Sequence, residues 1–198
     1  MSLSYPMSFP SGIGISRFTM RFRKSVAMSE SPFSYAQQVH DFGGARWEAE
    51  ITIPPLSESD AQVFQAFLIG LEGRKGTFTM GNPLHTATGT VDFHTAASKG
   101  DTSIILNGAA MSVGTYFSLE DDSVTPSRHH LHMITEAKAS GDNQTVNIQP
   151  PLRFDAAVDD VLDLTQPIGI WRLSANDVDW STDAGRLTPF TFACVEAL

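Results

Sequence analysis

Alternation of apolar and polar residues near the start of the chain predicts a β-strand with one covered face. In the segment RFTMRFR, which begins at Arg17, the apolar residues Phe18, Met20 and Phe22 occupy every second position. Side chains of an extended chain point alternately to its two sides, so these three share one face and the arginines share the other. The segment is therefore expected to be half-buried.

A second segment, RWEAEITIPP, alternates more strictly over residues 46–55. Its inward-facing members are expected to be Trp47, Ala49, Ile51 and Ile53. Because neither proline of the closing Pro54-Pro55 pair can donate a ladder hydrogen bond, we expect the strand pairing to end there. The two segments, with FSYAQQVHDF between them, predict an antiparallel sheet with one covered face.

One helix is predicted near residues 58–72. Ser57 can cap its first turn, and Asp60 stands at the capping-box spacing from it. Apolar residues then recur at the helical period, at Ala61, Phe64, Phe67, Leu68 and Leu71. We expect this stripe to cover the open face of the sheet, and the following KGTFTMGNP to form a strand that turns at Asn82-Pro83.

From residue 84 onwards, short alternating runs recur between glycine and aspartate turns. They are GTVDF, TSIILNG, GTYFSLEDD, RHHLHMITEA, QTVNIQPPLR and PIGIWRLS. This spacing predicts a small barrel or sandwich, and the apolar run RLTPFTFACVEAL at the end of the chain is expected to return to the first sheet.

The predicted fold is therefore mainly β (α+β): an antiparallel β-sandwich with one flanking α-helix, plus a small inserted β-barrel. Residues 1–83 and 175–198 are expected to form the sandwich, and residues 84–174 the inserted barrel. With 198 residues, 41% of them hydrophobic, the chain is long enough to bury a core without further crosslinks.

The net charge of -9 is unevenly distributed. Residues 1–80 hold seven Lys and Arg and seven Asp and Glu, whereas residues 81–198 hold six and fifteen. An acidic surface repels a polyanion, so we expect no sequence-specific nucleic-acid binding there. The same charge also suits a wall past which DNA slides, but solubility alone is the simpler explanation and the one we favour.

The single cysteine, Cys194, excludes an intramolecular disulfide and is expected to be a small buried hydrophobe. The first residues lack a basic segment followed by a continuous apolar run, and no stretch approaches 18 apolar residues. We therefore expect a soluble, non-secreted protein that does not insert into a membrane.

Candidate chemistry is sparse. His130 and His132 lie on one strand face, with His129 opposite, and two such imidazoles can share a metal ion. A third ligand is not evident at a useful spacing, so we favour hydrogen-bonded or exposed histidines. We expect no catalytic, cofactor-binding or metal-binding residue, and no enzyme activity.

Basic residues follow the first strand at Arg17, Arg21 and Arg23, and Lys24 extends the stripe. The simplest interpretation is a solvated strand face. In an oligomer, the stripe could instead meet the acidic second unit of a neighbouring subunit and orient the contact.

Several of these segments resemble the small tail proteins of long-tailed bacteriophages, especially the distal tail (tail-tip adaptor) proteins. The resemblance rests on the order of ARWEAEITIPPL, the helix SDAQVFQAFLIGLEGRKGTF and TMGNP, and on GTYFSLEDD, LHMITEA, SGDNQ and VNIQPPLR in the second unit. It spans most of the chain, but its motifs are structural and contain no catalytic residue.

The resemblance implies a tube-like fold that assembles in the host cytoplasm, as a homo-hexameric ring around the DNA channel of the virion tail. Its partners would be the tail tube protein and the tail-tip or hub proteins. Phe33 and Ile69 are then candidate subunit contacts together with Arg17, Arg21 and Arg23, because exposed apolar residues are unfavourable unless a partner covers them.

Two other functions remain open at this point. A carbohydrate-binding module for host attachment would use Trp171, Trp180 or Tyr116 as an exposed aromatic platform. A tail-tip hydrolase would use Asp or His residues such as His132 near the mouth of the barrel.

Overall fold

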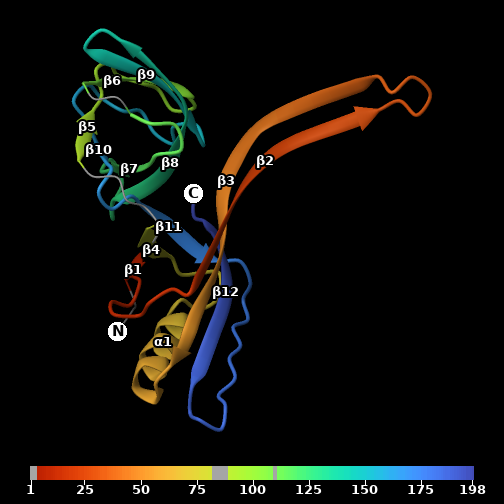
Figure 1. Ribbon diagram of the computed structural model, residues 1–198, viewed down its shortest axis with the longest axis vertical. Coiled ribbons are helices and arrows are strands. Elements are labelled where there is room, and N and C mark those ends of the chain that lie inside the picture. Colours follow the sequence, from red (N-terminus) through yellow and green to blue (C-terminus); the bar gives the residue numbers. More distant parts are fainter. Residues whose placement is uncertain (1–3, 82–88, 109–110) are drawn as a thin grey trace.

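The computed structural model describes residues 4–81, 89–108 and 111–198, and within these residues it contains two six-stranded sheets and one α-helix. The predicted mainly β fold is confirmed. Figure 1 shows three parts: a body made of the first sheet and the helix, a barrel beside it, and a long hairpin that projects from the body. All strand pairs are antiparallel except that of the two shortest members at one edge of the first sheet.

The first sheet combines strands from both ends of the chain. In spatial order it contains β1 (Met7–Ser8), β4 (Phe78–Gly81), β11 (Ile168–Leu173), β12 (Thr188–Glu196), β3 (Gln37–Leu56) and β2 (Arg17–Glu30). The inward face predicted for β3 is confirmed, since its alternating apolar residues from Trp47 to Ile53 are buried. The predicted return of the C-terminal run is also confirmed, because β12 pairs with β3.

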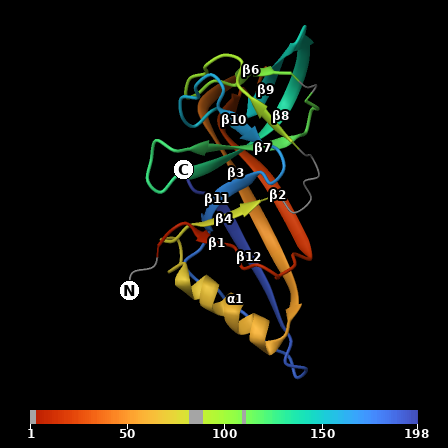
Figure 2. The same ribbon diagram turned by 90° about the vertical axis from the view of Figure 1, so that its left-hand side faces the viewer.

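Helix α1 (Glu58–Gly70) begins as predicted. The Ser57 hydroxyl oxygen accepts from the backbone N–H of Asp60 and donates to its carboxylate. Figure 2 shows α1 lying across one face of the first sheet, with the barrel at the far end of that sheet. The helix therefore provides the cover that the alternation in β3 requires.

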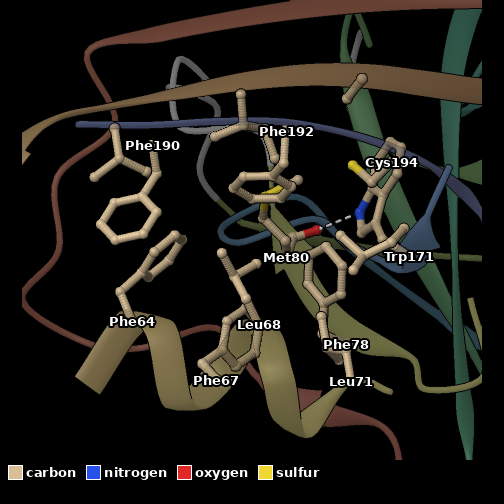
Figure 3. Close-up of a cluster of buried hydrophobic side chains, with 14 of the residues drawn as sticks. Phe64, Phe67, Leu68, Leu71, Phe78, Met80, Trp171, Phe190, Phe192 and Cys194 are labelled. Atoms are coloured by element: carbon tan, nitrogen blue, oxygen red, sulfur yellow. Dashed lines mark hydrogen bonds between the residues drawn. The ribbon is translucent and has the colours of Figure 1, made fainter. Parts of the chain in front are cut away.

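Aromatic rings make up much of the core between helix and sheet (Figure 3). The Phe64 ring lies edge-on to Phe190 with ring centroids 4.9 Å apart, and Phe9 from the N-terminal segment approaches Phe64 at 5.9 Å. Trp171 is buried on β11, and its indole N–H donates to the Met80 carbonyl at 3.0 Å. Cys194 lies in the same core, as predicted, and burial raises the pKa of its thiol.

The prediction that Pro54-Pro55 ends the strand was wrong. β3 continues through both prolines to Leu56, which pairs with Thr188 of β12. Between the pairs Ile53–Phe190 and Leu56–Thr188, β3 has two residues and β12 has one, so β3 itself bulges at the prolines. An irregular ladder can include two residues that cannot donate a hydrogen bond. The prediction assumed a regular ladder, which cannot.

The second sheet forms the inserted unit. In spatial order it contains β5 (Thr90–Asp92), β10 (Val161–Asp163), β7 (Tyr116–Asp121), β8 (Arg128–Ser140), β9 (Asn143–Gln149) and β6 (Ser103–Asn107). A bridge between Phe93 and Leu106 brings its two ends together, and the His94 N–H donates to the Ile105 carbonyl at 2.9 Å. The sheet thus curls around its own apolar core, as Figure 1 shows.

The unit boundary predicted at residues 174/175 requires a correction. β11 pairs with β4 and β12 in the first sheet, so the inserted strands end with β10. The IGIWRL segment was assigned to the barrel because local alternation identifies a strand but not its sheet. The boundary at 83/84 and the turn at Asn82-Pro83 lie outside the described residues.

The two units are in direct contact. Leu131 of β8 is part of the core of the first sheet, and the backbone of Gly169 on β11 lies so close that an added Cβ would meet Leu131 Cβ at 3.3 Å. Within the described residues, no helix is long and apolar enough to cross a membrane.

The core predicts a large cost for Phe64→Ala. Removing this fully buried ring should lower the free energy of unfolding by about 3–5 kcal/mol, measured by urea denaturation. Val63→Ala is the matched control, because Val63 is exposed on the same helix and its truncation should change stability by less than about 0.5 kcal/mol. Equal losses in the two variants would contradict this description of the core.

Candidate interaction surface

The projecting hairpin consists of the distal halves of β2 and β3, and residues 25–44 are called the arm here. Its strands are paired from Val26 with Asp41 to Glu30 with Gln37, and a turn over residues 31–36 joins them. Figure 1 shows the arm leaving the body as a two-stranded ribbon. An isolated two-stranded ribbon is at best marginally stable in water, so the arm has little internal support.

The arm exposes large apolar side chains. They are Val26, Met28, Phe33, Tyr35, Val39 and Phe42. Met28 lies opposite Val39 on one face of the ribbon, whereas Phe42 packs its ring against His40 on the other. Phe33 in the turn is 96% exposed, the largest value among the exposed hydrophobic residues. Apolar residues gathered in this way indicate an interaction surface.

Both edges of the arm are open in the described structure. β2 is the last strand of its sheet, and β12 pairs with β3 only as far as Glu48. Backbone groups on the outer edges of the arm are therefore available for pairing with another chain.

Arg17, Arg21 and Arg23 of the predicted basic stripe lie on the face of the sheet away from the helix, whereas Lys24 pairs with Ala45 on the other face. Two of the three arginines contact glutamates of β3. Arg21 contacts Glu50 at 3.4 Å, and Arg23 contacts Glu48 at 3.5 Å. Lys24 contacts Asp41 at 2.7 Å. These pairs are exposed and each contributes little to stability.

A hollow of about 550 Å³ lies where the arm leaves the body. Its lining includes Arg23, Lys24 and Arg46 together with Val26, Ala45 and Leu198. All three cations form ion pairs, Arg23 and Arg46 with Glu48 and Lys24 with Asp41, so the polar part of the lining is largely paired.

An ion pair between half-buried Arg153 and buried Glu196 holds the root of the arm, defined as residues 45–47 of β3. Arg153 Nη2, from the loop after β9, donates to Glu196 Oε2 at 3.0 Å and to the Ala45 carbonyl at 2.6 Å. Glu196 Oε2 also accepts from the Trp47 backbone N–H at 3.0 Å. We call Arg153 and Glu196 the clamp, because together they join the barrel, β12 and the arm root.

Burial raises the pKa of Glu196, although the positive charge of Arg153 and the Trp47 N–H oppose the rise. The Trp47 side chain adds another link, since its indole N–H donates to the Leu131 carbonyl of β8 at 2.9 Å. The Ala45 carbonyl and the Trp47 indole thus tie the arm root to the barrel, and the Trp47 backbone N–H ties it to β12.

The histidines singled out in the sequence lie near the clamp, where both His130 and His132 are buried. His132 is fully buried, its ring stacks on Phe117, and its Nδ1 donates to the Pro150 carbonyl at 2.8 Å. Burial lowers the pKa of His130 to about 4 and that of His132 to about 3, and the positive charge of Arg153 also disfavours protonation of both. Among the described residues, no three His, Cys, Asp or Glu side chains gather as metal ligands.

The aromatic residues considered for glycan binding do not share a surface. Trp171 is 1% exposed in the core, whereas Trp180 packs against Phe190 at the other end of the body and Tyr116 lies beside Trp47. Ile69 is 60% exposed on the outer face of α1, which leaves it available as the subunit contact proposed from the sequence.

Sequence reasoning identified Phe33 but missed the arm and the clamp. Val26 and Val39 stand among polar residues, so the alternation that predicts the two strands does not extend to them. Residues 37–42, which lie between the two predicted strands in the sequence, belong to the same hairpin. No local signal links Arg153 and Glu196 to residues 45–47, because the three segments meet only in the folded chain.

Comparison with known proteins adds no family. A scan against protein-family models finds no match, and a search of curated proteins finds none that is significant.

The neutral buried histidines predict a loss of stability in acid. Their pKa values are lower in the folded chain than the ordinary 6.5, so the unfolded chain takes up protons that the folded chain refuses as the pH falls from about 6.5 towards 4. The free energy of unfolding should fall by up to about 1.4 kcal/mol per pH unit for each histidine, measured by urea denaturation at several pH values.

His132→Asn can still donate to the Pro150 carbonyl and should flatten this pH dependence, even though it lowers stability at neutral pH. His40→Asn, on the exposed arm, should leave the slope unchanged. If His132→Asn and the unsubstituted protein lost the same free energy between pH 7 and about pH 4.5, the buried neutral imidazole would not be the cause.

Proposed function

We propose that this chain is a structural protein of a bacteriophage tail, which forms a ring at the distal end and joins the tail tube to the tip complex around the DNA channel. The observation that carries the proposal is the arm, which offers exposed apolar side chains and two open strand edges. Such a surface is unfavourable in water and suits a protein that functions in an assembly.

The fold agrees with what the resemblance to distal tail proteins implies. A β-rich body is covered by one helix, and a barrel is inserted between its strands. This agreement supports the proposal at the level of architecture, since fold by itself does not determine function.

Identical copies are the partner that we propose for the arm. The turn of the arm, which contains Phe33, and α1, which contains Ile69, lie at opposite ends of the molecule (Figure 1). A symmetric dimer would pair each surface with itself, whereas a head-to-tail contact uses two different surfaces and closes into a ring when the rotation closes. We propose six copies, with Phe33, Ile69 and the Arg17, Arg21 and Arg23 stripe at or near the contacts.

The remaining partners are proposed from the same role. The tail tube protein and the tail-tip or hub proteins would bind the two ends of the ring, and DNA would pass through without sequence-specific contacts. The excess of acidic residues after residue 80 favours such passage, because like charges prevent the DNA from adhering. This role requires no cofactor and no catalytic residue.

Removing the apolar side chains of the arm should prevent ring assembly. We expect the purified chain to form rings by negative-stain electron microscopy, with a mass of six copies by native mass spectrometry. The triple variant Met28→Ser, Phe33→Ser and Val39→Ser should stay monomeric at concentrations where rings of the unsubstituted chain outnumber its monomers at least tenfold.

The control for that experiment removes apolar surface elsewhere, with Val113→Ser, Val158→Ser and Val161→Ser on the exposed surface of the inserted unit. These changes should leave ring formation intact. A chain that remains monomeric at every concentration tested, or an arm variant that assembles normally, would remove the support for a self-assembling ring.

The location in the virion is tested separately, by immunogold electron microscopy on particles from a lysate of the source. Label at the distal tip of the tail is the expected result. Label along the whole tail would indicate a tube subunit instead, and particles without label would exclude a virion protein.

A further inference from the structure

The arm meets its root at an irregular step in the β2–β3 ladder. Lys24 pairs with Ala45, but the next registered pair is Val26 with Asp41. Ser25 alone on β2 therefore faces residues 42–44 on β3. Extra residues on one strand form a bulge, which bends the ribbon and interrupts its ladder of hydrogen bonds.

Two glycines make this step possible. Gly43 has a φ of +74°, a left-handed backbone conformation that glycine adopts without strain. Gly44 lies against Ser25, since a Cβ added at Gly44 would stand 3.1 Å from the Ser25 Cβ. The strands are therefore close together at a point where the backbone is locally least restrained.

One side chain spans the bulge. Asp41 Oδ1 accepts from the Gly43 backbone N–H at 2.8 Å, and Asp41 Oδ2 contacts Lys24 Nζ at 2.7 Å. Asp41 thus connects the first pair of the arm to the last pair of the root. Both contacts are exposed, so this restraint is weak.

The clamp lies immediately on the other side of the step. Regular pairing of β3 with β12 ends at Glu48 and Val195, and side chains then replace the missing strand. Glu196 accepts from the Trp47 N–H and Arg153 donates to the Ala45 carbonyl, so support reaches the last residue before the bulge. The contrast is between a buried restraint at residue 45 and an exposed one at residue 41.

We propose that the bulge at Ser25 and residues 42–44 is a hinge of the arm, and that the Arg153–Glu196 clamp fixes the position of this hinge and the direction of the arm. With the clamp intact, bending is confined to the bulge. When the clamp is broken, the root loses the two side chains that replace the missing strand, and the arm can bend as far back as Trp47, whose indole still donates to the Leu131 carbonyl. This inference does not rest on the proposed ring, because it concerns the single chain.

The test is a pair of distance measurements by double electron–electron resonance. Spin labels at Ser29→Cys on the arm and Lys138→Cys on β8 measure the distance between arm and barrel. Labels at Thr191→Cys on β12 and Lys138→Cys measure the distance between body and barrel. These sites are exposed, whereas Cys194 is buried and can remain. Dilution with excess unlabelled protein removes distances between copies, whether or not rings form.

Breaking the clamp with Glu196→Gln or Arg153→Gln should broaden the distance distribution between arm and barrel at least twofold. The distribution between barrel and body should keep its width, because the packing of Leu131 and Gly169 is untouched, and this narrow distribution also verifies that the variant is folded. Glu50→Gln is the matched control, since it removes an exposed ion pair of β3, the strand that carries the arm root, and should change neither distribution.

A second variant tests the hinge without touching the clamp. Asp41→Asn removes the charge that spans the bulge and should broaden the distribution between arm and barrel, by less than the clamp variants do. Unchanged arm distributions in Glu196→Gln, Arg153→Gln and Asp41→Asn would overturn the proposal. Equal broadening of both distributions in a clamp variant would also overturn it, since the clamp would then hold the barrel rather than the arm.

Discussion

Strand β3 extends far beyond its neighbour β12, and both the arm and the clamp follow from this difference in length. β3 runs over 20 residues, whereas β12 has 9 and pairs with β3 no further than Glu48. Beyond that point, the backbone groups of β3 that face away from β2 need another partner or water. The chain meets the need in two ways: buried side chains serve the root, and the arm leaves its edges open.

The ion pair of the clamp stands at a place where apolar packing would also be stable, so its presence needs a reason other than stability. Burying two charges costs free energy that their attraction only partly returns, so the pair adds little net stability. The geometry of the ion pair orients the arm root instead. Arg153 and Glu196 hold the Ala45 carbonyl and the Trp47 N–H in fixed directions, and they join the barrel, the C-terminal strand and the arm root at one point.

The chemistry of the arm is that of association. Its ribbon has two strands and no covering layer, so contact with a partner would both bury its apolar residues and stabilise its ladder. Charged residues such as Lys24, Glu30 and Asp41 lie among those apolar residues and limit indiscriminate edge pairing before the partner is met. A ring of identical subunits provides such a partner at every arm, and a clamp that sets the arm's direction would reduce the entropy lost on assembly.

Local patterns in the sequence determined the strands and the helix, but not their arrangement. The alternation from Trp47 to Ile53 and the Ser57 cap depend on neighbouring residues, so the covered face of β3 and the start of α1 could be predicted. β10 was missed because three residues are too few to show a period. The tertiary structure decided that β11 joins the first sheet, that β3 passes through its prolines, and that Arg153 and Glu196 meet at the arm root. Each of these depends on hydrogen bonds and packing between segments far apart in the sequence, which no single segment encodes.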